Sequence, residues 1–228
     1  MRSRCSRITC EGADALAPRS SIGRFITLEG GEGAGKTTQA RLLADALTAR
    51  GLNVLRTREP GGAPGAEALR TLLLSGDVAF APLAETLLHF AARAEHVERT
   101  IRPALAAGTW VVSDRFADST MAYQGWGLGA DRATITALTG MIGLVPDLTI
   151  ILTVSPAAAD ARLLARGGAA DRYERLDADF HARVAAGFRA IAAAEPGRCA
   201  LVDADANPAA VQAAILGVPR LASLLPAA

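Results

Sequence analysis

Short apolar runs alternate with longer stretches of helical periodicity along most of the chain. The apolar runs predict five strands, at Phe25–Glu29, Asn53–Thr57, Trp110–Asp114, Leu148–Val154 and Cys199–Val202. Apolar residues spaced by three or four positions predict helices over residues 35–50, 65–75, 83–107, 131–143, 156–194 with a break, and 207–224. Strands that are apolar throughout and separated by helices are typical of a parallel sheet covered on both faces. The pattern therefore predicts a doubly wound α/β domain whose ligands bind at the carboxyl ends of the strands.

The size and charge balance of the chain narrow the classes of partner. It has 228 residues and a formal net charge of +1, so no overall field attracts nucleic acid or an anionic membrane, and phosphate binding must be local. The longest apolar run, Leu148–Val154, is far shorter than the roughly 20 residues of a membrane-spanning helix. We therefore expect no nucleic acid and no membrane among the partners.

The first 23 residues differ from the rest, because they mix arginines with acids and lack the apolar segment of a secretory signal. We expect residues 1–23 to be a disordered extension, or the result of a start site placed too far upstream, and residues 24–228 to form a single domain. The three cysteines, Cys5, Cys10 and Cys199, have neither a metal-ligand spacing nor the even number of a disulfide set. Free thiols are typical of a reducing compartment, so we expect a cytoplasmic protein.

The first predicted strand runs into a glycine-rich loop that matches G-x-x-x-x-G-K-[ST] and precedes a predicted helix. The loop contains Lys36, the single lysine among 24 basic residues. Such a loop wraps its backbone N–H groups around the phosphates of a nucleotide, and Thr37 offers a hydroxyl to Mg²⁺. We expect ATP to contact Gly30, Gly31, Glu32, Gly33, Ala34, Gly35, Lys36, Thr37 and Thr38.

The third predicted strand ends in Asp114 and Arg115. An acid at the end of an apolar strand suits a second Mg²⁺ contact, and a guanidinium beside it suits a second phosphate. A surface ion pair is the alternative for this pair of residues. A GTPase that reads guanine through Asn-Lys-x-Asp is excluded, since Lys36 is the only lysine. A nucleotide-binding regulatory protein remains an alternative, although we expect such a protein to lack the Asp-Arg pair or a basic lid.

Several further motifs resemble those of bacterial thymidylate kinases in order and spacing. Besides the glycine-rich loop, they are Thr-Arg-Glu-Pro-Gly-Gly at 57–62, Ala-Ala-Arg at 91–93, Asp-Arg-Phe at 114–116, Ser-Thr-Met-Ala-Tyr-Gln at 119–124 and Pro-Asp-Leu-Thr at 146–149. The resemblance covers residues 24–224. It implies a P-loop nucleoside-monophosphate-kinase-like fold, and Mg²⁺-dependent transfer of a phosphoryl group from ATP to dTMP. It also implies a homodimer formed through helices on one face of the sheet. Another nucleoside or nucleoside-monophosphate kinase on the same fold is the nearest alternative, and the 119–124 segment argues against it.

The resemblance also assigns the residues that bind the phosphate and the sugar of dTMP. Arg115 would hold the phosphate, with Arg58 as a second contact. Tyr123 would crowd the sugar 2′ position and so favour a deoxynucleotide. Glu32 takes the place of an acid that lies near the sugar 3′-hydroxyl in similar enzymes.

By the same resemblance, Arg93 would reach a thymine carbonyl while Thr120 and Gln124 meet the base. Many relatives have Phe four residues before this arginine, where it stacks on thymine, and this chain has His89 there. Phe90 follows, but one residue turns a helical side chain by roughly 100°, so we expect Phe90 to enter the core and His89 to face the base.

A glycine break at residues 167–170 predicts a mobile lid over about residues 166–175. The glycine-rich loop carries no arginine, so Arg166 and Arg172 would supply positive charge to the transferring phosphoryl group, as in the basic-lid type that the chain resembles. With Lys36 and Asp114, these two arginines complete the expected catalytic set. Arg162, on the helix before the lid, would pack over adenine.

Overall fold

The computed structural model describes residues 23–76, 78–167 and 172–226. A five-stranded parallel sheet forms its centre, in the order β2-β3-β1-β4-β5. The strands are β1 (Phe25–Gly30), β2 (Val54–Arg58), β3 (Trp110–Asp114), β4 (Leu148–Thr153) and β5 (Cys199–Asp203). The predicted doubly wound sheet is confirmed, and each strand lies within two residues of its expected bounds.

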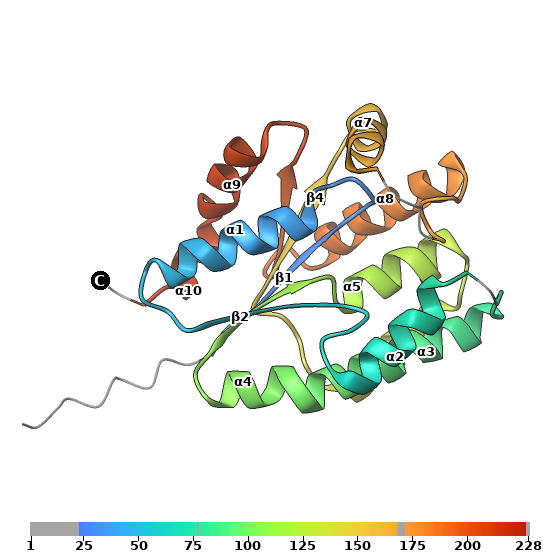
Figure 1. The fold of residues 1–228 in the computed structure, drawn as a ribbon, viewed down its shortest axis with the longest axis horizontal. Helices are drawn as coiled ribbons and strands as arrows, with labels where there is room; N and C mark the ends of the chain where they lie inside the picture. The colour runs from blue at the N-terminus through green and yellow to red at the C-terminus, as the bar shows by residue number, and fades with distance from the viewer. Residues whose placement is uncertain (1–22, 77, 168–171, 227–228) are drawn as a thin grey trace, which may run out of the picture.

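Helices cover both faces of the sheet (Figure 1). In chain order they are α1 (Lys36–Thr48), α2 (Pro64–Leu74), α3 (Pro82–His96), η1 (Val97–Ile101), α4 (Arg102–Ala106), α5 (Ala117–Thr120), η2 (Met121–Gly127), α6 (Arg132–Ile142), α7 (Pro156–Arg166), α8 (Ala178–Ala194), α9 (Pro208–Leu216) and α10 (Pro219–Leu224). The π-helical turn η1 joins α3 to α4, so the helix predicted over 83–107 forms as one continuous helical segment. Among the described residues, no helix combines the length and apolar character that crossing a membrane requires.

Alternate residues of the inner strands enter two different cores, as the period of a strand requires. Ile26 and Leu28 of β1 pack with residues of α1, α9 and α10 on one face. Phe25 packs with η1 and Phe116 on the other face, where a neighbouring cluster joins Tyr123 to α8. All six residues of β1 are buried, since β3 and β4 flank it in the sheet. The central strand thus gives a rigid base to the loop that follows it.

Two predictions about organisation fall partly or wholly outside the described residues. The N-terminal extension of residues 1–23 is described only at Gly23, and residues 168–171 of the expected lid are likewise outside the description. On either side of residues 168–171, α7 ends at Arg166 and Arg172 begins a turn that leads into α8.

Candidate active site

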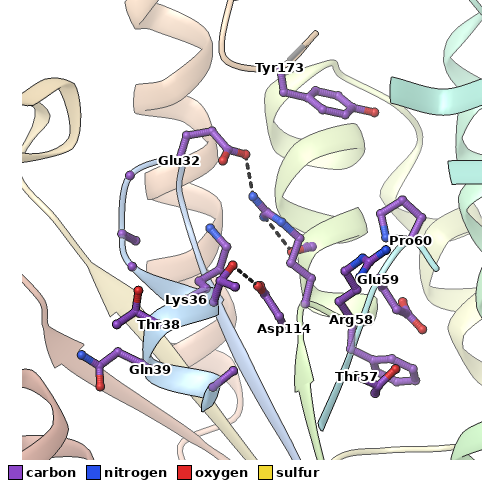
Figure 2. A pocket seen from close by; sticks show the side chains of 18 of the residues that line it. Glu32, Lys36, Thr38, Gln39, Thr57, Arg58, Glu59, Pro60, Asp114 and Tyr173 are labelled. Carbon is purple, nitrogen blue, oxygen red and sulfur yellow. Dashed lines mark hydrogen bonds and ion pairs between the residues drawn. The ribbon is translucent and has the colours of Figure 1, made fainter. Parts of the chain in front are cut away.

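A cavity of about 960 Å³ opens where the loops after β1, β2 and β3 converge, with walls from α1, α3, α5, α7 and the segment before α8. In Figure 2, Asp114 lies between Lys36 and Glu32 on one side and Arg58 on the other, and Tyr173 lies at the top of the view. The cavity therefore occupies the carboxyl end of the sheet, where the strand pattern predicts ligand binding.

The glycine-rich loop curls tightly between β1 and α1. Gly30 has φ 136°, and a Cβ there would collide with the carbonyl oxygen of Leu152. Lys36 lies at the start of α1 and is only 7% exposed. Its Nζ donates to the carbonyl oxygens of Gly31, at 2.6 Å, and Gly30, at 3.1 Å. Burial lowers the pKa of this ammonium, and Arg115 lowers it further. The lysine side chain thus folds back over the loop and joins the start of α1 to the start of the loop.

Thr37 and Asp114 meet at the floor of the loop. Thr37 Oγ1 lies 2.5 Å from Asp114 Oδ2. A hydroxyl and a carboxylate side by side at the phosphate loop are oxygen donors of the kind that Mg²⁺ prefers. The two residues predicted to hold the metal are therefore brought together.

Arg115 is the electrostatic centre of the cavity. It is the one non-glycine residue with positive φ, at 72°, among those that the structure describes. Its Nη2 lies 2.5 Å from Glu32 Oε1 and 3.2 Å from the Tyr123 hydroxyl, and its guanidinium lies 4.8 Å from the centre of the Tyr123 ring. Burial alone would raise the pKa of Glu32, but Arg115 and Lys36 hold it at about 2.

A buried carboxylate that sequence reasoning missed supports the unusual backbone of Arg115. Glu29 accepts from the backbone N–H of Phe116 at 2.7 Å and from Ser119 Oγ at 2.5 Å, and Ser119 Oγ also lies 3.2 Å from Arg115 Nη1. Burial, together with the nearby Asp118 carboxylate, raises the pKa of Glu29 to about 8. The one feature of the sequence that could have indicated this role is that Glu29 is an acid at the end of a mostly apolar predicted strand.

Arg93 lies in another wall of the cavity, on α3. It is 3% exposed, and its Nη2 donates to the carbonyl oxygen of Phe116 and to Thr120 Oγ1, both at 3.0 Å. Its Nε donates to Glu59 Oε2 at 2.8 Å. The guanidinium lies 4.8 Å from the centre of the Phe90 ring, and Phe90 is buried as expected. Arg93 Nη1 has no hydrogen-bond partner among the described residues. Arg93 lines the cavity, and Nη1 is the guanidinium nitrogen whose hydrogens have no acceptor in the described part of the chain.

Four side chains form a hydrogen-bonded group near Arg93. Glu85, 1% exposed, accepts from the Tyr173 hydroxyl at 2.8 Å and from Gln124 Nε2 at 3.0 Å. Tyr173 also contacts His89 Nε2 at 3.0 Å. Burial lowers the pKa of His89 to about 3, with help from the neighbouring arginines. A neutral His89 therefore faces the cavity and is tied to Tyr173, which sequence reasoning had placed only in the lid.

Two more arginines flank the loop after β2. Arg58 forms an ion pair with Glu67 at 3.0 Å and lines the cavity. Arg70, on α2, donates to the carbonyl oxygen of Pro60 at 2.7 Å and also lines the cavity. Burial lowers the pKa of Arg70, as does its proximity to Arg58. Sequence reasoning missed Arg70, because nothing in the pattern of α2 separates it from a surface arginine.

The remaining predicted residues lie toward the donor end and the lid. Arg162 Nη2 donates to the carbonyl oxygen of Ala204 at 2.5 Å, and its Nη1 donates to that of Gly33 at 3.3 Å, so it links the glycine-rich loop to the segment after β5. Arg166 pairs with Glu174 at 2.7 Å, and both line the cavity. Arg172 pairs with Glu85 at 2.5 Å and is not among the cavity-lining residues.

The structure thus gathers most of the predicted site residues around one cavity. Those that line it are Glu32, Gly33, Ala34, Gly35, Lys36, Thr37, Thr38, Arg58, His89, Arg93, Asp114, Arg115, Thr120, Tyr123, Gln124, Arg162 and Arg166. Gly30 and Gly31, at the start of the loop, accept hydrogen bonds from Lys36 through their carbonyl oxygens. The individual role of each residue stays a prediction.

Comparison with known proteins identifies the family. The family model described as thymidylate kinase matches residues 28–215. The thymidylate kinase of Gluconobacter oxydans is 57% identical over 198 residues, which cover 85% of this chain and 92% of the relative. That of Caulobacter vibrioides is 53% identical over 199 residues, covering 86% and 95%. The crystal structure of thymidylate kinase from Ehrlichia chaffeensis superimposes with a TM-score of 0.70 at 35% identity and covers 85% of this chain and 96% of that chain. The chain belongs to the thymidylate kinase family.

Proposed function

We propose that the cavity holds ATP at the glycine-rich loop and dTMP between Arg115 and Arg93, so that one pocket carries out the reaction of the family. That reaction is the transfer of the γ-phosphoryl group of ATP to dTMP, which gives dTDP and ADP. The observation that carries this arrangement is Arg93, whose Nη1 is a buried donor without a partner among the described residues. Because a guanidinium can only donate, the missing partner is an acceptor such as a base carbonyl.

At the donor end, Thr37 and Asp114 would hold Mg²⁺, since their oxygens already lie side by side. When bound, the ion neutralises charge on the β- and γ-phosphates and orients them. Lys36 would exchange its two loop carbonyls for phosphate oxygens. Arg166 would add positive charge from the lid side, which the glycine-rich loop does not provide beyond Lys36.

At the acceptor end, Arg115 would bind the dTMP phosphate, with Arg58 and Arg70 as further cations in the same wall. A phosphate oxygen of dTMP then attacks the γ-phosphorus as the bond to the ADP oxygen breaks. Both phosphates are polyanions that repel one another, so Arg115 and Lys36 stabilise their close approach.

The sugar and base of dTMP would lie against α5, η2 and α3. Tyr123 projects its hydroxyl toward Glu32, where its ring leaves little room for a 2′-hydroxyl, and Glu32 would meet the 3′-hydroxyl. Thr120 and Gln124 are buried beside Arg93 and its neighbours and would complete the base pocket with His89.

We also propose that the enzyme is a cytoplasmic homodimer. Leu83 and Leu87 stand one turn apart on α3 and are 55% and 47% exposed, and Met141 on α6 is 81% exposed. These apolar side chains lie on two helices that pack against each other, α3 and α6. A second copy that covers them would remove them from water. The partly buried free thiol of Cys199 suits a reducing compartment.

A coupled assay of ADP release with dTMP, dUMP, UMP, dCMP and AMP as acceptors tests the proposed function. We expect turnover that depends on both ATP and Mg²⁺ and is highest with dTMP. Preference for another monophosphate would indicate a different acceptor. ADP release that is independent of any acceptor would indicate a protein that hydrolyses ATP without transferring phosphate.

A further inference from the structure

A chain of buried side chains lies behind Arg93 and is used by none of the steps above. His96 follows Arg93 by one helical turn, at the end of α3, and is 0% exposed. Its Nδ1 lies 3.1 Å from Glu59 Oε1, and its Nε2 lies 2.7 Å from Thr57 Oγ1. Because a carboxylate only accepts, Nδ1 carries the hydrogen of this hydrogen bond.

Glu59 connects this histidine to Arg93. Its Oε2 accepts from Arg93 Nε at 2.8 Å while its Oε1 accepts from His96. Both oxygens are therefore committed, and rotation of the carboxylate would break both bonds. With Glu59 5% exposed, water offers no easy substitute for either partner. The orientation of the Arg93 guanidinium is thus fixed from behind by a carboxylate that is itself fixed by His96.

His96 is packed closely against the loop after β2. Gly62 has φ 83°, and a Cβ there would collide with His96 Nε2 and with Thr57 Oγ1. Thr100 Oγ1 donates to the carbonyl oxygen of Gly62 at 2.8 Å, which holds the loop against the helix. Glycine at position 62 therefore allows the loop after β2 to close over the histidine.

The fixed guanidinium matters because Arg93 has one donor, Nη1, without a partner among the described residues. A donor at a fixed position can donate to a carbonyl oxygen, but it cannot pair with an amino group, which is itself a donor. Thymine and cytosine differ in this way at position 4 of the ring. A buried donor that pairs with the thymine carbonyl disfavours the cytosine amino group. This selectivity depends on how rigidly the donor is positioned.

We propose that His96 is a positioning residue for recognition of the acceptor base, acting through Glu59 on Arg93. The inference rests on the proposed function, in which Arg93 meets the base of dTMP. His96 touches neither substrate in this scheme. Its loss should therefore weaken selection of the base and leave the chemistry at the phosphates intact.

Two substitutions of similar polarity distinguish the contribution of Nδ1 from that of Nε2. In His96→Asn, the amide nitrogen takes the place of Nδ1 and can still donate to Glu59. In His96→Gln, the amide reaches the place of Nε2 and can still bond Thr57, but the bond to Glu59 is lost. Glu98→Gln, at an exposed residue on the next turn that pairs with Arg102, serves as the matched control. Thermal unfolding of each purified variant shows that it is folded.

The readouts are kcat and KM for dTMP and for dCMP, and KM for ATP. We expect His96→Gln to raise the KM for dTMP about tenfold and to reduce the preference for dTMP over dCMP by a similar factor, the size of about one lost hydrogen bond. Its kcat at saturating dTMP and its KM for ATP should stay within about twofold of wild type. His96→Asn should restore most of the preference, and Glu98→Gln should match wild type.

Equal behaviour of the Asn and Gln variants, or an unchanged preference in a folded His96→Gln protein, would overturn the role of His96. A wild-type protein that does not phosphorylate dTMP would overturn the proposed function instead. The wild-type arm of the same experiment therefore distinguishes the two failures.

Discussion

Arg115 Nη2 lies 2.5 Å from Glu32 Oε1, so the arginine assigned to the acceptor phosphate is paired with a carboxylate of the glycine-rich loop. The pair joins the two halves of the cavity, since Glu32 belongs to the loop after β1 and Arg115 follows β3. If the dTMP phosphate binds Arg115 as proposed, it shares this guanidinium with Glu32 or displaces Glu32 from it. In the proposed arrangement, Arg115 therefore links the acceptor phosphate to the glycine-rich loop through Glu32.

Arg115→Ala should impair the acceptor site before the donor site. Loss of a charge-assisted contact to phosphate corresponds to about 2 to 3 kcal/mol, or roughly 100-fold in the KM for dTMP. The KM for ATP should change by less than about threefold. Initial rates with each substrate varied in turn measure the two constants. An unchanged KM for dTMP in the folded variant would place the phosphate elsewhere.

Lys36→Ala should lower kcat by about 10³-fold or more, because the ammonium stabilises charge that develops in the transition state. The variant should fold, because the hydrogen bonds of Lys36 go to loop carbonyl oxygens and its side chain belongs to no apolar cluster of the described residues. Single-turnover kinetics and thermal unfolding measure the two effects. Near-normal turnover in a folded variant would contradict the assignment.

Substitutions of Tyr123 should separate the roles of its ring and hydroxyl. The ring packs edge-on against Tyr173 and Phe180 and lies in a buried cluster, so it has a structural task as well. Tyr123→Phe should keep the preference for dUMP over UMP, which differ only in the 2′-hydroxyl. Tyr123→Leu should reduce that preference about tenfold, since steric exclusion is lost. Equal losses of turnover on both substrates would show that Tyr123 is structural only.

His89→Phe should change how stability depends on pH. Burial lowers the pKa of His89 from 6.5 to about 3. Between these values the unfolded chain binds a proton that the folded chain does not, so the free energy of unfolding falls as the pH falls below 6.5. The variant lacks this contribution. Wild type should therefore lose stability relative to His89→Phe between pH 7 and pH 5 in urea titrations.

The same variant should retain or improve binding of dTMP, because phenylalanine also presents a planar ring to the base. A collapse in dTMP affinity would mean that the imidazole makes an essential polar contact. A stability difference that does not vary with pH would mean that His89 is not held neutral by the fold.

The two lid arginines should differ in their effects. Arg166 lines the cavity, whereas Arg172 pairs with Glu85 beside the proposed base pocket. Arg166→Ala should therefore lower kcat by about 10²-fold or more with little change in the KM for dTMP. Arg172→Ala should mainly raise the KM for dTMP. The opposite pattern in steady-state kinetics would reverse the two roles.

The fold could be predicted because its signals are local. β1 and β4 are mostly apolar, and Gly30 to Thr37 combine a strand end, a glycine-rich turn and a helix start in one short segment. The resemblance to a family added residues from α3 and η2, which no local pattern would bring to the same cavity. Because the strands are parallel and in register, the loops that follow them meet at one edge of the sheet.

The rest could not be predicted because it depends on buried polar contacts between distant segments. Glu29, Glu85 and His96 lie in apolar or mixed stretches where the pattern gives no hint of a partner. Their partners are 37 to 90 residues away along the chain. Arg70 likewise gains its place only because α2 packs back over the loop after β2.

The central claim is direct transfer of phosphate within one cavity, and the fate of labelled phosphorus tests it most directly. The enzyme is incubated with Mg²⁺, dTMP and ATP labelled at the γ-phosphorus, and the products are separated by chromatography. We predict that the label appears in dTDP, with one ADP formed for each dTDP, and that this label is lost in Lys36→Ala. Label released as free phosphate while dTMP stays unmodified would contradict the account.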